Sequence, residues 1–269
     1  MTITAGAATS IGRVRAVNED AWCITPGLWA VADGMGGHRA GDRASQLAVG
    51  ALTELGQQGS LTTEQLQAAL AGANAAMLRE SGTSPGERAM GTTVCGVAEV
   101  SLGGARHWAV FNIGDSRVYQ VVAGGLEQLT VDHSEVQELL SAGRITAREA
   151  RAHPLRNVVT RSLGSSPAPE ADVWLIPIEP DQTFVLCSDG LTLELDDDQI
   201  AAVLRTGGAA PADIAQELVS LADAAGGRDN ITVVVVRTDV PEGHPDVELT
   251  NPHGRALLAD DDEAGTDRG

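Results

Sequence analysis

The stretch from Thr92 to Val122, TTVCGVAEVSLGGARHWAVFNIGDSRVYQVV, decides the fold class of this chain. It contains three β-rich runs, at residues 92–100, 106–113 and 117–122. Gly103-Gly104 joins the first two runs, and Gly114-Asp115-Ser116 joins the last two. β-rich runs separated by such short turns are typical of a meander, so the stretch predicts antiparallel sheet.

Helical and strand-like patterns surround this stretch on both sides. Before it, we expect a buried strand at 27–33 and helices at 39–55 and 62–80, the second capped by Thr62 or Thr63. After it, we expect helical segments at 134–142, 147–152, 197–205 and 212–225, with Pro211 in the first turn of the last. Further strands are expected near 158–163, 171–176, 183–187 and 231–237. Strands interrupted by helix pairs predict one α+β domain and not a doubly wound βαβ fold.

The composition narrows the possible functions of the chain. Its 269 residues allow one large domain or two small ones, and an apolar content of 43% is ordinary for a globular protein. All 18 basic residues are Arg, and 37 acidic residues leave a net charge of −19. Phosphate contacts need clustered cations, so nucleic acid is excluded as the main partner. Without Lys, a P-loop lysine and a Schiff base are excluded as well.

The cysteines and the N-terminus indicate the compartment. Cys23, Cys95 and Cys187 lie far apart in apolar runs, which fits neither a disulfide framework nor a zinc site. We interpret them as buried thiols in a reducing compartment. Residues 1–10 lack the pattern of a signal peptide, and no stretch approaches the roughly 18 apolar residues that span a bilayer. We therefore expect a soluble, cytoplasmic protein with no membrane partner.

The character of the sequence changes near Pro241. Apolar periodicity stops there, and residues 260–263 form the acidic run Asp-Asp-Asp-Glu. We predict a folded domain over residues 1–240 and a disordered acidic tail over residues 241–269. A tail that binds a partner is the alternative interpretation.

Four aspartates adjoin β-rich segments and are flanked by Gly, Ser or Asn, namely Asp33, Asp115, Asp189 and Asp229. Carboxylates in such positions can project into one cleft, where their mutual repulsion requires cations. Oxygen ligands of this kind suit Mg²⁺ or Mn²⁺. Each Asp-Gly or Asp-Ser pair alone is also a common turn. The four together, with the further acids of Asn18-Glu19-Asp20, favour a metal site over four independent turns.

The loop Gly34-Met35-Gly36-Gly37-His38-Arg39 follows a strand and precedes a helix, as a dinucleotide-binding loop does. However, Arg39 occupies the third glycine position, and Asp33 would repel a pyrophosphate. We therefore interpret the loop as one that lets the backbone approach a metal or its water closely. A serine hydrolase is poorly supported because the sequence has no G-x-S-x-G motif, and it has no H-E-x-x-H zinc motif.

The ordered set of motifs resembles one family. The set is Arg15-Ala16-Val17-Asn18-Glu19-Asp20, Asp33-Gly34-Met35-Gly36-Gly37-His38, Gly91-Thr92-Thr93, Gly114-Asp115-Ser116-Arg117, Ser188-Asp189-Gly190 and Asp229-Asn230. Each motif alone is weak, but the order is specific and spans about Thr9 to Arg237. The chain thus resembles the bacterial PPM-type (protein phosphatase 2C-like) metal-dependent serine/threonine protein phosphatases. Residues 132–163 also resemble the flap of bacterial members and the strand after it.

This resemblance implies a fold and a set of metal ligands. The fold would be α+β, with a central sandwich of two antiparallel β-sheets flanked by helix pairs in four layers, α-β-β-α. Two ions, Mn²⁺ or Mg²⁺, would lie at one edge, with Asp33 bridging both and Gly34 binding one through its carbonyl. Asp189 and Asp229 would complete the ligands of the first ion. Asp115 matches the acid that holds a weaker third ion, and Asp132 is a second candidate for that site.

The resemblance also implies a reaction. A metal-bridging hydroxide would hydrolyse phosphoserine and phosphothreonine of phosphorylated proteins directly. Glu19 and Asp20 would orient metal-bound waters, and the planar guanidinium of Arg15 would hold the phosphate. An ion pair of Arg15 with Glu19 or Asp20 is the alternative.

The chain departs from the family pattern at the candidate general acid. Eukaryotic relatives carry a His directly after the Asp-Gly pair, where this chain has Met35. His38 is therefore the candidate acid or phosphate contact, and a plain helix-start residue is the alternative. A metal-bound water is another candidate for the acid.

Two hypotheses from different classes follow. The first is an active phosphatase of phosphorylated proteins, including one dedicated to a single regulator. The second is a catalytically weak module of the same fold that binds phosphoproteins. The intact set of acids favours the first, because a degenerate module is expected to lose a ligand such as Asp33 or Asp189.

Overall fold

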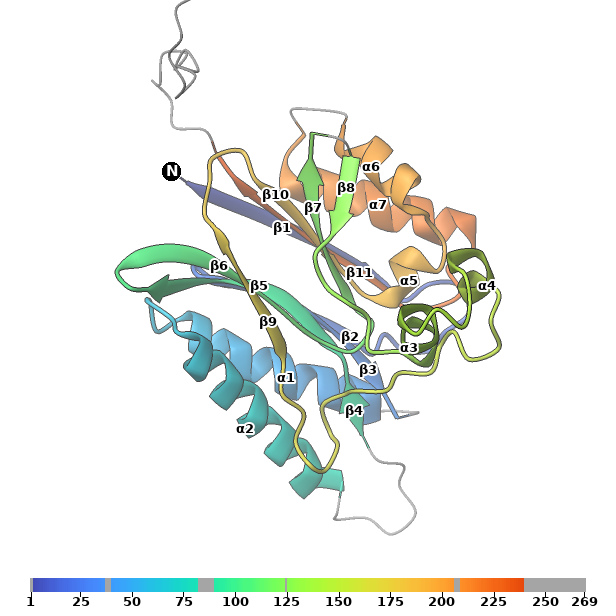
Figure 1. The fold of residues 1–269 in the computed structure, drawn as a ribbon, viewed down its shortest axis with the longest axis horizontal. Helices are drawn as coiled ribbons and strands as arrows, with labels where there is room; N and C mark the ends of the chain where they lie inside the picture. The colour runs from blue at the N-terminus through green and yellow to red at the C-terminus, as the bar shows by residue number, and fades with distance from the viewer. Residues whose placement is uncertain (1, 37–39, 82–89, 124, 206–208, 240–269) are drawn as a thin grey trace, which may run out of the picture.

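Two antiparallel sheets lie face to face in the computed structural model, which describes residues 2–36, 40–81, 90–123, 125–205 and 209–239 (Figure 1). The first sheet has the order β1 (Ile3–Ser10), β11 (Ile231–Thr238), β10 (Thr183–Cys187), β7 (Arg117–Val122), β8 (Gly125–Gln128). The second has the order β2 (Asp20–Ile24), β3 (Leu28–Met35), β5 (Val94–Leu102), β6 (Ala105–Ile113), β9 (Asp172–Pro177), and the short β4 (Gly91–Thr92) pairs with β3.

Aromatic side chains join the inner faces of the two sheets. The Trp108 ring of β6 meets Trp29 of β3 edge to face, with a centroid distance of 5.7 Å, and Phe184 of β10 at 5.4 Å. The Trp108 indole N–H donates a 2.8 Å hydrogen bond to Gln182 Oε1, so the polar end of this buried ring is satisfied. The contact from Trp108 to Phe184 spans the interior of the sandwich and holds the sheets together.

Helices cover both outer faces. α1 (Ala40–Gly56) and α2 (Thr63–Ser81) pack on the second sheet, whereas α5 (Asp189–Thr192), α6 (Asp197–Leu204) and α7 (Pro211–Ala225) pack on the first (Figure 1). α3 (Glu135–Ser141) and α4 (Ala147–Arg151) line a groove whose other wall is the α5–α6 region. The predicted four-layer α-β-β-α sandwich is thus confirmed.

Most predicted elements are present within a residue or two of their expected bounds. The Thr62 hydroxyl accepts a 3.3 Å hydrogen bond from the Gln65 N–H, so Thr62 is the N-cap residue of α2. Pro211 is the first residue of α7, as expected.

The predicted strand at 158–163 is wrong. This segment makes only two isolated bridges, Val159 with Ser134 and Leu163 with Thr92. Because its two ends pair with different parts of the chain, no continuous ladder forms. The predicted three-stranded meander is wrong in its last step, since β6 belongs to the second sheet and β7 to the first. Gly114, with φ of 111°, makes the turn at which the chain changes sheets.

No separate strand or helix was expected at β1, β2, β8 or α5. β1 has the sequence ITAGAATS, whose small residues carry a weak strand signal. The structure explains these residues, because a Cβ on Gly6 would lie 2.2 Å from the backbone nitrogen of Ala212 in α7. Small side chains therefore let α7 approach β1.

None of the described helices is both long and apolar enough to cross a bilayer. The predicted tail at 241–269 and its acidic run lie outside the described residues. The predicted domain boundary at residue 240 follows the last described strand, β11, by two residues. The three cysteines are free and buried.

Two leucines of α7 test how this helix contributes to stability. Leu218 is fully buried against the first sheet, whereas Leu221 is 42% exposed. We expect Leu218→Ala to lower the free energy of unfolding by about 2–5 kcal/mol, because it leaves a cavity in the core. Leu221→Ala is the matched control, with a change of no more than about 0.5 kcal/mol. Urea unfolding followed by circular dichroism measures both, and equal losses would contradict the packing described.

Candidate active site

Asp20 and Asp33 lie directly opposite each other in the β2–β3 pair. Asp33 is inside β3, not at its end, and its backbone carbonyl accepts a 2.8 Å hydrogen bond from Thr92 Oγ1. Asp20 is buried, and one of its oxygens accepts a 2.8 Å hydrogen bond from Ser188 Oγ. Like charges opposite each other destabilise a sheet, so this pair does not serve the stability of the fold.

Three more aspartates approach this pair from the first sheet and its connections. Asp115 lies in the turn at which the chain passes from β6 to β7. Asp189 is the first residue of α5, directly after β10. Asp229 lies two residues before β11. The acids that the sequence analysis grouped together therefore come from both sheets.

The pKa values of these carboxyl groups reflect their burial and their mutual repulsion. Burial, followed by the charges of Asp20, Asp189, Asp115 and Asp229, raises the pKa of Asp33 well above its usual range. Burial raises the pKa of Asp20 to about 6. Burial, with repulsion from a neighbouring carboxylate, raises the pKa of Asp115 and of Asp189 to about 7 each. In the absence of cations, such a cluster holds protons that isolated aspartates release near pH 4.

The donor set fits divalent cations. Glu19 Oε1, Asp20 Oδ1 and Asp189 Oδ1 are buried and have no hydrogen-bond partner among the described residues. No three His, Cys, Asp or Glu side chains of the described ranges are gathered so as to hold a metal by themselves. Mg²⁺ usually keeps several waters and takes only one or two carboxylates from the protein, so an all-protein cage is not required. Buried, unpaired carboxylate oxygens are what such an ion would need.

Gly34 has a structural reason to be glycine. A Cβ at this position would lie 2.1 Å from the backbone oxygen of Gly41 and 2.5 Å from that of Glu19. β3 therefore packs closely on the start of α1 and on the Glu19 backbone. The Glu19 carboxylate in turn lies beside Gly41, where a Cβ would be 2.6 Å from its Oε1. Burial raises the pKa of Glu19.

Arg15 places a guanidinium group against Asp229. Its Nη2 lies 2.6 Å from Asp229 Oδ2, and its side chain is half exposed. The hydrogen bond to Asp229 is the main reason why the pKa of Arg15 is raised. The alternative ion pair that the sequence analysis considered, with Glu19 or Asp20, is not the one formed.

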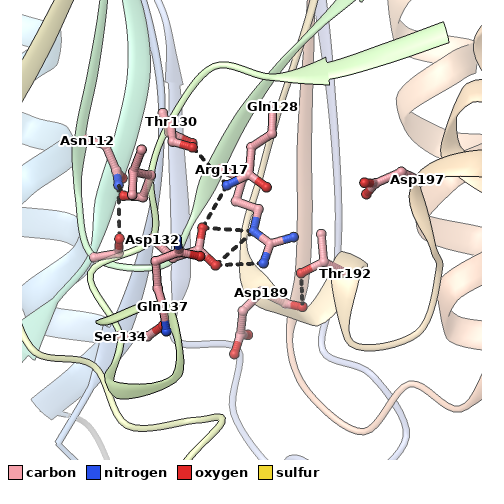
Figure 2. A network of polar contacts seen from close by, with 12 residues as sticks. Asn112, Arg117, Gln128, Thr130, Asp132, Ser134, Gln137, Asp189, Thr192 and Asp197 are labelled. Atoms are coloured by element: carbon pink, nitrogen blue, oxygen red, sulfur yellow. Dashed lines mark hydrogen bonds and ion pairs between the residues drawn. The ribbon is translucent and has the colours of Figure 1, made fainter. Parts of the chain in front are cut away.

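Asp132, the second candidate for a third ion, is engaged elsewhere. The Arg117 guanidinium donates to both of its carboxylate oxygens, with Nη2 to Oδ2 at 2.6 Å, and Gln128 Nε2 donates to Oδ1 at 2.9 Å (Figure 2). Burial by itself would lower the pKa of Arg117. Its interactions with Tyr119 and Asp132 have the larger effect, so the pKa of Arg117 is raised overall. Both oxygens of Asp132 are thus already hydrogen-bonded to side chains of the protein.

Sequence reasoning missed two residues that organise the site. Ser188 donates to Asp20 and accepts a 3.0 Å hydrogen bond from the Thr232 N–H. Asn230 accepts from the Glu19 N–H at 2.8 Å and donates to the carbonyls of Ile11 and Val17. Both adjoin candidate ligands in the sequence, and that adjacency was the available signal. His38, the candidate acid, lies outside the described residues.

A groove of about 530 Å³ leads away from these acids. Asp115 and Asp189 line it on the side of the site, and α3 and α4 form one wall. Glu194, Asp197 and Arg228 line the opposite side. A segment of another molecule that enters this groove would therefore reach the carboxylate cluster.

Known proteins are similar to this chain over most of its length. The family description "Protein phosphatase 2C" matches residues 9–226. The serine/threonine phosphatase stp of Listeria monocytogenes is 35% identical over 245 residues, which cover 87% of this chain and 95% of that protein. The serine/threonine protein phosphatase PstP of Mycobacterium tuberculosis is 38% identical over 226 residues, 83% of this chain but only 43% of that longer protein.

A solved structure extends the likeness to three dimensions. The catalytic domain of the serine/threonine protein phosphatase PstP, solved in complex with two manganese ions, superposes with a TM-score of 0.79 at 34% identity. The match covers 88% of this chain and 99% of that one. The match of the family over most of the chain and the shared fold lead to one conclusion: this chain belongs to the protein phosphatase 2C family.

Proposed function

We propose that the carboxylate cluster holds two divalent cations and hydrolyses phosphoserine and phosphothreonine of protein substrates, with Arg15 binding the phosphate. As a family member, the chain is a metal-dependent serine/threonine protein phosphatase, and therefore a hydrolase. The observation that carries the site assignment is the convergence of five aspartates, in which burial and the charges of the other four raise the pKa of Asp33. So much buried negative charge is a cost unless cations share the site.

The residues fall into three roles. Asp33, the Gly34 carbonyl, Asp189 and Asp229 would hold two ions, and Asp115 a third. Bound ions of this kind supply an activated water and offset the charge on the phosphate oxygens. Glu19 and Asp20, each with a buried oxygen that has no partner in the described part of the chain, would accept hydrogen bonds from water at the site. Mn²⁺ and Mg²⁺ both suit these ligands.

Arg15 would orient the substrate. Only one of its nitrogens has a hydrogen-bond partner among the described residues, Asp229, so the other donors of the guanidinium are free to bind phosphate oxygens. The side chain is half exposed and lies at the edge of the cluster. A planar, permanently charged fork suits phosphate better than an ammonium does.

The partners would be phosphorylated proteins, including kinases and their substrates, in the cytoplasm. The three free, buried thiols support a reducing compartment. The alternative of a weak phosphoprotein-binding module is less well supported, since Asp33 is present and interacts electrostatically with the other four aspartates of the cluster.

Asp33→Asn tests the metal site. We expect phosphate release from a phosphothreonine peptide in Mn²⁺ to fall by at least about 10³-fold, because a ligand central to both ions is lost. The metal-free variant should stay folded, with a midpoint of thermal unfolding above that of metal-free wild type at pH 7, since it removes a buried carboxyl group whose raised pKa lowers stability at that pH. Asp198→Asn, an exposed acid of α6, is the control and should retain activity. Full activity of folded Asp33→Asn would refute the assignment, and no release by metal-loaded wild type would favour the binding module.

Arg15→Ala tests the phosphate contact. We expect kcat/KM on the same peptide to fall about 10- to 100-fold, because hydrogen bonds to charged groups contribute about 1.5–3 kcal/mol. Arg13→Ala is the matched control, since Arg13 is exposed in the same loop and its side chain makes only a 3.9 Å ion pair with Asp223 within the described part of the chain. Steady-state kinetics at saturating Mn²⁺ measure both variants. Equal effects of the two substitutions would show that Arg15 acts only through the general charge of the loop.

The raised pKa values predict how the stability of the metal-free protein depends on pH. Asp20, Asp115 and Asp189 have folded-state pKa values of about 6, 7 and 7, above the unfolded value of about 4. Between these limits the folded state binds more protons than the unfolded state, so stability falls as pH rises from about 4 to about 7. In EDTA, the midpoint of thermal unfolding should therefore be lower at pH 7.5 than at pH 5.5, and Mn²⁺ should raise it more at pH 7.5. The reverse order would contradict the coupling of these acids.

A further inference from the structure

Asp189 and Asp229, the two acids proposed to complete one ion site, belong to separate segments. Asp189 opens α5, and Asp229 lies in the loop 226–230 between α7 and β11. On the sheet side the segments are joined by the paired strands β10 and β11, with the Thr232 N–H donating to Ser188 Oγ at 3.0 Å. At the start of α5, a Cβ on Gly190 would lie 1.9 Å from the backbone oxygen of Asn230. These links lie after Asp229 in the chain, so the loop ahead of Asp229 needs a link of its own to the chain after α5.

Glu194 and Arg228 form this link. Arg228 Nε donates to Glu194 Oε1 at 2.8 Å, and Nη2 donates to Oε2 at 3.1 Å. The backbone N–H of Arg228 donates to Oε1 at 3.0 Å, and Nη2 also reaches the carbonyl of Leu193 at 2.6 Å. The loop before Asp229 is thus tied by four hydrogen bonds to the chain just after α5.

The burial of the two side chains differs sharply. The Glu194 side chain is 4% exposed, whereas that of Arg228 is 61% exposed. A Cβ on Gly226 would lie 2.5 Å from Glu194 Oε2, so the carboxylate is seated directly against the loop. A buried carboxylate needs a charged partner, and the hydrogen bond from Arg228 lowers the pKa of Glu194. Removal of either the Glu194 or the Arg228 side chain should therefore displace the loop 226–230, and not only change the protein surface.

We propose that the Glu194–Arg228 pair is a positioning pair, which sets the separation of Asp189 and Asp229 and thereby the affinity for the ion they share. The proposal rests on the proposed function, because it assumes that these two acids bind a metal. Residues that orient a metal ligand without touching the metal typically change metal affinity 10- to 100-fold when they are removed. Arg228 precedes Asp229 in the sequence, and Glu194 follows the helix that Asp189 opens.

A different role for Arg228 gives a different result. Arg228 lines the groove that leads to Asp115 and Asp189, so its guanidinium is also placed to contact a substrate. If Arg228 contacts the substrate, its removal would change KM and leave the affinity for Mn²⁺ unaltered. If the pair is purely structural, its removal would lower the midpoint of thermal unfolding and leave KM and the affinity for Mn²⁺ unaltered. Metal affinity therefore separates the three roles.

The experiment titrates Mn²⁺ into the metal-free full chain by isothermal calorimetry. Arg228→Ala and Glu194→Gln are expected to weaken Mn²⁺ binding about tenfold or more, and Arg228→Lys, which keeps the charge but loses the fork, should fall between them and wild type. Saturating Mn²⁺ should restore kcat and KM on the phosphothreonine peptide. Arg43→Ala is the matched control, because Arg43 makes the same two-pronged contact to Glu80, at 2.8 and 2.7 Å, between α1 and α2.

The outcomes separate this inference from the proposed function. Circular dichroism first establishes that each variant is folded. If wild type binds Mn²⁺ and hydrolyses the peptide, but Arg228→Ala and Glu194→Gln bind Mn²⁺ within twofold of wild type, only the positioning role is overturned. An increase in KM alone would make Arg228 a substrate contact. If wild type neither binds Mn²⁺ nor hydrolyses the peptide, both proposals fail, and Asp33→Asn then gives the same result as wild type.

Discussion

Repulsion among buried carboxylates is the constraint around which this molecule is built. Asp20 and Asp33 face each other across neighbouring strands, and Asp115, Asp189 and Asp229 approach them from the first sheet and its connections. None of these contacts favours the folded state in the absence of cations. The stability of the fold must therefore come from other contacts. Buried apolar residues provide these contacts in three clusters, one between the sheets and one beneath each helical layer.

The sandwich places the acids by joining its two sheets at one end. The chain crosses from the second sheet to the first at Gly114, which brings Asp115 to the junction. Ser188 and Asn230 add hydrogen bonds across the same junction, to Asp20 and to the Glu19 backbone. Because these links are short and join different strands, the carboxylates are held by rigid elements. Rigid placement is what a centre that binds two ions and a phosphate requires.

Charge complementarity around the site is local. The chain carries a net charge of −19, yet guanidinium groups stand at particular points of the site: Arg15 on Asp229, Arg117 on Asp132 and Arg228 on Glu194. Arg117 and Arg228 each pair through two nitrogens with a carboxylate that is not a proposed ligand. These pairs neutralise Asp132 and Glu194, whereas Arg15 pairs with Asp229 through only one of its nitrogens among the described residues. A chain without lysine thus uses the directional geometry of arginine at each of these points.

The sequence by itself determined the family, the α+β class and the acids of the candidate site. Ordered motifs, glycine turns and alternating patterns are local features, so strands such as 183–187 and the helix after Pro211 were predictable from neighbouring residues. Only the tertiary structure decided which sheet each strand joins and that the segment 158–163 forms no strand. It also decided that Asp132 pairs with Arg117 and that Arg15 pairs with Asp229. These outcomes depend on contacts between residues far apart in the chain: Arg15 lies 214 positions from Asp229, and Arg228 lies 34 from Glu194. Local patterns carry no information about such pairs, because only the packing of the two sheets and their helices brings them together.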